Sequence, residues 1–169
     1  MTSSPFSGPT NELNGARLVA LNPRDCAPLA EAIVAMPPWS VMNYPADALA
    51  RFLESSDGGV SRYLVEIGGN QAGAVSVRYP WLKGPYLELL AILPAYQGAG
   101  VGSAILGWFE REAIRLRARN LFVCASSFNA RALLFYGRHG FQPAATLHGL
   151  VADGYNEILL RKSPLGEQG

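Results

Sequence analysis

The sequence predicts a single α/β domain in which a mixed β-sheet carries helices on its faces. Three observations support this prediction. The chain has 169 residues, a common size for one domain. Apolar residues make up 49% of it and charged residues only 16%, so it can bury a substantial core. Short apolar segments alternate with segments of helical periodicity, and turn-forming residues separate them.

The N-terminal part is expected to hold a tail, a strand and two helices. Residues 1–15 are rich in Ser, Thr, Pro, Gly and Asn without periodicity, so we expect a flexible tail before a domain over residues 16–165. Asp25 is a suitable cap for the first helix, and Pro37-Pro38 ends it. The elements expected here are a strand over 16–21, a helix over 25–36 and a short helix after Pro45.

The rest of the chain alternates strands and helices. Residues 86–93 read YLELLAIL, which is typical of a strand covered on both faces. The segment 68–71 has the composition of a hairpin turn. Asn129 and Gly140 are residue types that begin and end helices. We therefore expect strands over 61–67, 72–79, 86–93, 121–125, 141–147 and 155–161, and helices over 102–119 and 130–139.

Charge, cysteine content and hydropathy argue against several classes of protein. A formal charge of +1 gives no broad field for nucleic acid or an acidic membrane. Cys26 and Cys124 lie far apart, which argues against a disulfide scaffold and a zinc site, and we expect no metal. No apolar run approaches the about 18–20 residues that span a bilayer. The first residues lack the pattern of a secretory signal, so we expect a soluble, cytoplasmic protein.

The most informative stretch is the glycine-rich turn 97–103 between a strand and a helix. Glycines let the backbone approach a ligand, and the free N–H groups of a helix start favour a phosphate or pyrophosphate. The turn is not a P-loop, since no Lys follows the glycines. Nor is it a dinucleotide fingerprint, because Ser103 stands where a glycine is required. The alternative is a structural turn that lets the helix pack closely on the sheet.

The turn and two downstream segments resemble motifs of the GNAT N-acetyltransferase superfamily. Gln97–Gly102 fits the [QR]-x-x-G-x-[GA] motif and follows an apolar strand ending in Leu93-Pro94. Asn129–Ala132 and Phe135–Phe141 are similar to the N-x-x-A and [FL]-Y-x-x-x-G-F elements. The order and spacing of these motifs agree with those of the superfamily over about residues 60–162.

This resemblance implies a mostly antiparallel sheet with a V-shaped splay and acetyl-CoA as the acyl donor. A β-bulge in the strand 86–93 would free main-chain groups for the pantetheine arm, and the turn would hold the pyrophosphate. Tyr136 would approach the thioester sulfur. The residues implied in cofactor binding are Leu90, Ile92, Gln97, Gly98, Ala99, Gly100, Val101, Gly102, Ser103 and Asn129.

Acetyl transfer to an amine needs a base for the ammonium and a weak acid for the departing thiolate. Tyr136, with an ordinary pKa of about 10, is a candidate for the acid; the alternative is a half-buried packing residue. Glu88 is a candidate for the base, because alternation before any bulge places it on one face with Leu90, toward the cleft that would hold the cofactor. Its alternative is an ion pair with Arg78, which leaves water or Glu157 as the base.

The sequence therefore predicts an N-acetyltransferase that moves acetyl to a primary amine by direct attack, with both substrates bound together. One alternative is a non-catalytic acyl-CoA-binding or regulatory module, and another is an enzyme with a different acyl-CoA or acceptor. The acceptor is a small-molecule or peptide amine, and edge strands allow a homodimer. Apolar side chains near the proline breaks line the acceptor groove or pack in the core: Trp39, Met42, Tyr44, Tyr79 and Trp81. Cys124 is expected to be a core residue.

Overall fold

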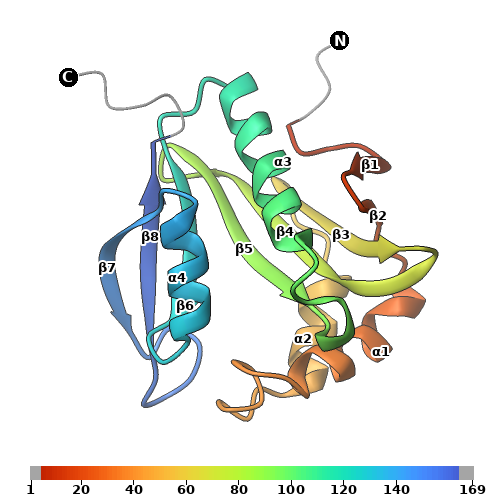
Figure 1. Cartoon of the computed structure of the whole chain (residues 1–169). Coiled ribbons are helices and arrows are strands. Elements are labelled where there is room, and N and C mark those ends of the chain that lie inside the picture. Colours follow the sequence, from red (N-terminus) through yellow and green to blue (C-terminus); the bar gives the residue numbers. More distant parts are fainter. Residues whose placement is uncertain (1–4, 164–169) are drawn as a thin grey trace.

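The fold is seen in a computed structural model that describes residues 5–163 and is centred on an eight-stranded sheet (Figure 1). The strand order is β1-β2-β3-β4-β5-β6-β8-β7, and neighbours are antiparallel except β5 and β6. The strands are β1 (Thr10–Leu13), β2 (Ala16–Ala20), β3 (Val60–Ile67), β4 (Asn70–Trp81), β5 (Gly84–Ile92), β6 (Leu121–Ser126), β7 (Gln142–His148) and β8 (Asn156–Lys162).

Helices cover both faces of this sheet, and each face has its own apolar core. One core joins α3 and α4 to the sheet and includes Phe109 and Ile105, both fully buried. The other joins α1 and α2 to the opposite face and includes Leu29 and Ile33. The helices are α1 (Pro23–Val34), α2 (Ala46–Glu54), α3 (Val101–Arg115), α4 (Ala130–Arg138) and a 3-10 turn, η1 (Pro94–Tyr96). The prediction of a mixed sheet with helices on its faces is confirmed.

The sheet splays open between its two central strands. Strands β5 and β6 pair only at Tyr86 with Phe122 and at Leu87 with Val123. Beyond these pairs β5 continues to Ile92 and β6 to Ser126, and Figure 1 shows the two strands diverging. The V-shaped splay expected from the resemblance is thus present, and it leaves one edge of each strand open.

A β-bulge at Glu88 changes the faces of β5. Leu87 lies opposite Val77 and Leu89 opposite Ser76, so Glu88 is the additional residue. As a result Leu87 packs in the α3 core and Leu89 in the α1–α2 core, although strict alternation would place them on one face. The expectation that Glu88 and Leu90 share a face is therefore wrong, because Leu90 packs against the α3 core.

The N-terminal segment differs from the expected flexible tail over residues 1–15. Residues 1–4 lie outside the described part, but β1 pairs with β2 along its whole length. Phe6 is 2% exposed and its ring lies 5.6 Å from that of Trp108. Tyr63 Oη donates a hydrogen bond to the Phe6 carbonyl. One buried aromatic side chain therefore fixes a segment whose overall composition is that of a loop.

The first helix begins earlier than predicted. Asn22, not Asp25, is its N-cap: Asn22 Oδ1 accepts a hydrogen bond from the Arg24 N–H at 3.2 Å. Pro23 occupies the first helical position, where no N–H partner is needed. Asp25 instead lies in the first turn, where a carboxylate interacts favourably with the helix dipole.

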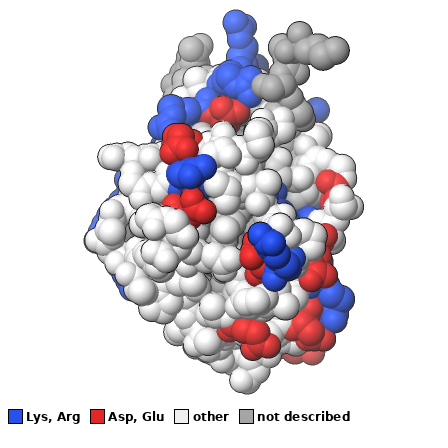
Figure 2. Space-filling view, turned by 90° about the vertical axis from the view of Figure 1, so that its right-hand side faces the viewer, with Lys and Arg blue, Asp and Glu red and all other residues white. Residues whose placement is uncertain are grey.

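The surface carries both signs of charge. Acidic and basic side chains are interspersed on the face shown in Figure 2, without a broad area of one sign. Within residues 5–163, no helix combines the length and the apolar character needed to cross a bilayer.

Candidate active site

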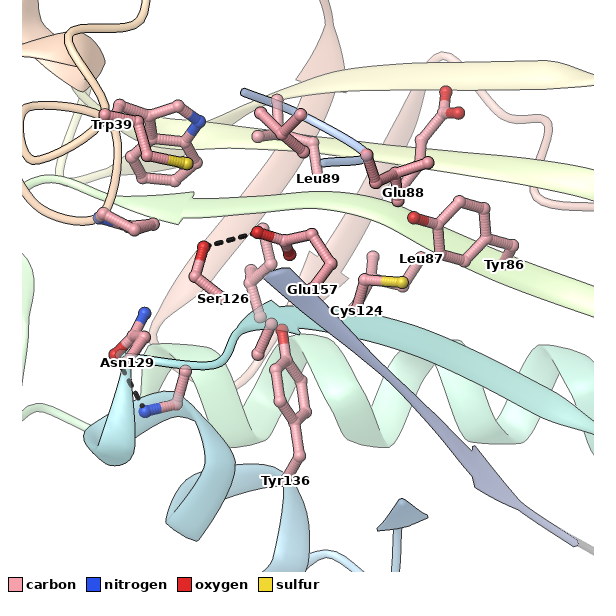
Figure 3. Close-up of a pocket in the computed structure, with 17 residues that line it drawn as sticks. Trp39, Tyr86, Leu87, Glu88, Leu89, Cys124, Ser126, Asn129, Tyr136 and Glu157 are labelled. Carbon is pink, nitrogen blue, oxygen red and sulfur yellow. Dashed lines mark hydrogen bonds between the residues drawn. The ribbon is translucent and has the colours of Figure 1, made fainter. Parts of the chain in front are cut away.

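A cavity of about 160 Å³ opens where the sheet splays (Figure 3). Its walls come from β5, β6, β8 and α4, and from the segments that follow α1 and precede β8. Four residues singled out from the sequence line it together: Glu88, Leu90, Asn129 and Tyr136. The fold therefore gathers at one place residues that are up to 48 positions apart in the chain, since Tyr136 and Glu88 come from different arms of the splay.

The glycine-rich turn lies at the start of α3 and presents backbone donors. Gly100 is the N-cap with φ of 82°, and Gly98 has φ of 80°. Among the described residues, no backbone carbonyl accepts from the N–H groups of residues 98–103. A Cβ added to Gly98 or Gly100 would meet nothing within 4 Å, so this side of the turn is open. Gly102 differs, because its Cβ would lie 3.1 Å from the Phe135 ring and the glycine serves packing.

Gln97 connects the turn to its surroundings through its side chain. Its Nε2 donates to the Ile92 carbonyl at 2.8 Å, and its Oε1 accepts from Arg131 at 3.3 Å. Its own N–H already donates to the Pro94 carbonyl at 3.3 Å. Gln97 therefore positions the turn on β5 and α4, and the free donors begin at Gly98. At the other end of the turn, Ser103 Oγ pairs with His139 Nε2 at 3.1 Å.

The open edge of β5 carries free main-chain groups. The Leu93 N–H donates to the Ala72 carbonyl at 2.8 Å, so by alternation Ala91 also pairs with β4. The N–H and carbonyl groups of Leu90 and Ile92 therefore face the other way, into the splay, where β6 no longer pairs. Both residues are thus placed where main-chain pairing with a ligand is possible, although the bulge itself lies at Glu88.

Asn129 caps α4 and also lines the cavity. Its Oδ1 accepts from the Ala132 N–H at 3.2 Å and caps α4, as the sequence predicts. Its side chain also lines the cavity, and Figure 3 shows the amide nitrogen on the cavity side. The amide is therefore free to donate into the cavity while its oxygen fixes the helix start.

Tyr136 reaches the cavity from α4. The residue is 7% exposed, and Figure 3 shows its hydroxyl directed into the cavity on the side where Glu157 lies. Burial, with a smaller contribution from Cys124, raises the pKa of Tyr136 above the usual value for tyrosine. The phenol therefore remains protonated throughout the neutral and mildly alkaline range.

Glu88 turns away from the cavity centre. Ser76 Oγ donates to its Oε1 at 2.7 Å and Arg78 Nε donates to its Oε2 at 3.0 Å. Arg62 Nη2 lies 3.8 Å from the same carboxylate, whose side chain is 10% exposed. Figure 3 shows the carboxylate on the side of β5 away from Tyr136. The geometry thus matches the ion pair that sequence reasoning gave as the alternative to a base.

Glu157 is the second carboxylate of the cavity, and sequence reasoning named it only as a substitute for Glu88. It lies on β8 and is 6% exposed. Ser126 Oγ donates to its Oε1 at 2.6 Å, and it forms no ion pair with any residue between 5 and 163. Burial raises the pKa of Glu157. The signal in the sequence is an acid directly before the apolar run 158–160.

Cys124 lines the same cavity from β6. Burial raises the pKa of its thiol, so the reactive thiolate is disfavoured. The structure describes no group of three or more His, Cys, Asp or Glu side chains able to hold a metal within residues 5–163. Among the described residues, the ionisable side chains that line the cavity are the phenols of Tyr86 and Tyr136, the carboxylates of Glu88 and Glu157, and the Cys124 thiol.

The apolar residues near the proline breaks divide into two groups. Trp39 and Met42 line the cavity, as expected for one wall of a groove. The remaining three pack elsewhere: Tyr44 against the α1–α2 core, Tyr79 against Phe6 at 6.1 Å, and Trp81 on Tyr86 at 4.7 Å.

Comparisons with known proteins agree with this geometry. The model of the Acetyltransferase (GNAT) family matches residues 27–141. An acetyltransferase structure from Thermus thermophilus is 21% identical, with a TM-score of 0.69 over 90% of this chain and 99% of that one. A nourseothricin acetyltransferase is 25% identical, with a TM-score of 0.57 over 64% and 67%. An acetyl-CoA-bound GNAT family acetyltransferase from Elizabethkingia anophelis is 13% identical, with a TM-score of 0.61 over 79% and 88%.

Proposed function

Because this chain belongs to the GNAT acetyltransferase family and is an acyltransferase whose donor is acetyl-CoA, we propose that it acetylates a primary amine by direct attack. The observation that carries this proposal is the pair of groups in the splay. A buried, protonated phenol on α4 and a buried carboxylate without a cation on β8 face one cavity beside the open edge of β5.

The donor fits the open edge and the turn. The N–H groups of residues 98–103 supply clustered donors at the positive end of α3, which suit a pyrophosphate. Main-chain groups of Leu90 and Ile92, with the Asn129 amide, suit the amide-containing pantetheine arm. The thioester would then lie in the cavity beside Tyr136.

We assign the base to Glu157. An amine acceptor arrives mostly as an ammonium, and its proton must leave before nitrogen can attack the thioester carbonyl. Glu157 accepts that proton, because it is buried, carries no cation and has a raised pKa. Glu88 is held by Ser76 and Arg78 on the other side of β5, so proton uptake there would break an ion pair.

We assign the acid to Tyr136. As the new C–N bond forms and the C–S bond breaks, negative charge moves onto sulfur and the nitrogen loses its second proton. The Tyr136 hydroxyl donates to the departing sulfur, and the proton released from nitrogen restores the phenol. The products are an N-acetyl amine and the thiol form of CoA. Of the two protons that nitrogen loses, one is held by Glu157, and the other replaces the proton that Tyr136 gave to sulfur.

The donor site predicts a specific loss in Gly100→Val. A β-branched residue is strained at φ of 82° and fills the open side of the turn, where the pyrophosphate would lie. We expect the Kd for acetyl-CoA, measured by calorimetry, to rise at least tenfold, which is about 1.4 kcal/mol. Gly69→Val is the matched control, because Gly69 has φ of 80° and nothing within 4 Å, but lies in the β3–β4 hairpin. Equal affinity in both folded variants would remove the turn from the donor site.

Direct attack predicts that the cavity thiol is dispensable. Cys124→Ala should keep kcat within about threefold of the wild type, because the raised pKa of the thiol leaves little thiolate. Mass spectrometry of the wild type incubated with acetyl-CoA alone should show no acetylated protein. A stable acetyl-enzyme that disappears in Cys124→Ala would replace direct attack by a covalent route.

The function itself is tested by thiol release. Acetyl-CoA and a panel of primary amines are mixed with the protein, and free CoA thiol is followed over time. Amine-dependent release with formation of the N-acetyl amine is the expected result. A regulatory module on the same fold would bind acetyl-CoA in calorimetry and release no thiol with any amine, and that outcome overturns the proposal.

A further inference from the structure

We infer that the acceptor is a primary amine attached to an uncharged, apolar body of about one aromatic ring, and that amines bearing a carboxylate are poor acceptors. This inference rests on the proposed function and gives the class of its second substrate. Three features of the cavity carry it: its charge, its mouth and its size.

The first feature is the charge of the cavity. Among the described residues that line it, two carry carboxylates, Glu88 and Glu157, and none is Lys, Arg or His. Glu88 is neutralised by Arg78 and Arg62. Glu157 is therefore the one uncompensated charge, and it attracts an ammonium. A carboxylate next to the acceptor amine would lie close to Glu157 with no cation to receive it, which is costly in a buried site.

The second feature is the apolar mouth, formed by the segment after α1 and the segment before β8. The two segments are joined, since Tyr155 Oη donates to the Val41 carbonyl at 3.2 Å. Val41, Leu150 and Val151 are 44%, 55% and 41% exposed, although large apolar side chains are usually covered. Leu150 and Val151 also line the cavity, and exposed apolar side chains at the rim of a pocket indicate a ligand of the same character. Trp39 extends this apolar surface into the cavity (Figure 3).

The third feature is the size of the cavity. Its volume of about 160 Å³ is close to the 150 Å³ of an engineered apolar cavity that admits benzene. Because the thioester of the donor also occupies this cavity, the space left for the acceptor holds at most about one ring, while an extended polyamine would place its second ammonium against the apolar side chains of the mouth without a partner. The three features together favour an arylalkyl amine over an amino acid or a polyamine.

The test compares three acceptors at saturating acetyl-CoA: 2-phenylethylamine, L-phenylalanine and putrescine. We expect kcat/KM for 2-phenylethylamine to exceed that for each of the others at least thirtyfold. The pair 2-phenylethylamine and phenylalanine differs by the carboxylate alone, so the ratio measures the effect of that group. If phenylalanine or putrescine is equal or better, this inference is overturned and the proposed function stands. If acetyl-CoA binds but no amine releases thiol, the proposed function fails, and the inference fails with it.

The second experiment changes the acceptor preference of the cavity by adding a cation. Val151→Arg places a cation at the mouth of the cavity, on a side chain that is already exposed. We expect it to shift the kcat/KM ratio of phenylalanine to 2-phenylethylamine at least tenfold toward phenylalanine. Leu150→Arg serves the same purpose if the first variant fails to fold. Leu134→Arg is the control, because Leu134 is 61% exposed on α4 and does not line the cavity. An unchanged ratio in the folded mouth variants contradicts the inferred electrostatic selection.

Discussion

Tyr136→Phe is expected to slow acetyl transfer about 100-fold, which is the usual contribution of one positioned acid. The change removes one hydroxyl and almost no volume, so the α4 packing and the Kd for acetyl-CoA should remain. The raised pKa of Tyr136 keeps the wild-type phenol protonated, so the ratio of the two rates should stay constant between neutral and mildly alkaline pH. Single-turnover thiol release measures the chemical step directly.

The control for this variant is Tyr86→Phe. Tyr86 lines the same cavity and its pKa is also raised by burial, but it comes from β5 and its ring stacks on Trp81 at 4.7 Å. We expect its rate to stay within about threefold of the wild type, well short of the effect of a positioned acid. Equal single-turnover rates for Tyr136→Phe and the wild type would return Tyr136 to the role of a packing residue.

Glu157→Gln is expected to lower kcat/KM at neutral pH about 100-fold and to remove the limb along which wild-type activity rises with pH. The amide keeps the acceptor oxygen for Ser126 but takes up no proton in this range. The loss should shrink in alkaline buffer, because the neutral fraction of the amine itself increases there. A full pH–rate profile of kcat/KM for both proteins provides the measurement.

Glu88→Gln is the matched comparison, because it makes the same chemical change at the other carboxylate of the cavity. Its carboxylate compensates Arg62, which is 8% exposed, and Arg78. We therefore expect a lower melting temperature, from a cost of about 1–3 kcal/mol for an unpaired buried group, with an intact pH–rate limb. If the limb disappears in Glu88→Gln and persists in Glu157→Gln, the assignment of the base reverses.

The stability of the wild type relative to Glu157→Gln should change with pH in the opposite sense to wild-type activity. Burial raises the folded pKa of Glu157 above the unfolded value, which is about 4.3. Such a group contributes stability that is fully present below the unfolded pKa and is lost as pH rises through the folded pKa. The wild type should therefore lose stability across that window relative to Glu157→Gln, and thermal melts at acidic and neutral pH show the difference.

The parts of the site that the sequence predicted are those fixed by local chemistry. The glycine-rich turn and the Asn129 cap depend on backbone conformation within a few residues, so their composition predicts them. The direction of the Glu88 side chain cannot be predicted in this way. The bulge that turns it is set by the register with Ser76 and Val77 on another strand. Alternation within β5 alone contains no information about that register.

Two further differences have the same physical origin. Phe6 is buried because Tyr63 and Trp108, distant in the chain, form its pocket, whereas the surrounding residues are those of a loop. Glu157 becomes the candidate for the base because β8 places its carboxylate opposite Ser126, where no described cation pairs with it. An acid beside apolar residues is present in the sequence at both Glu88 and Glu157, and only the three-dimensional arrangement of the cations separates the two carboxylates.

The narrow junction between β5 and β6 also bears on how the protein unfolds. Strands β1–β5 and β6–β8 are each contiguous in sequence, and backbone pairing across the sheet passes through two residue pairs alone. The core under α3 still joins the two groups of strands, so they should unfold together, whereas the strand ends beyond the junction should open locally, which amide hydrogen exchange resolves. Acetyl-CoA in the splay would stabilise the folded state by mass action. We expect donor binding to slow amide exchange most at the ends of β5 and β6 that face the splay.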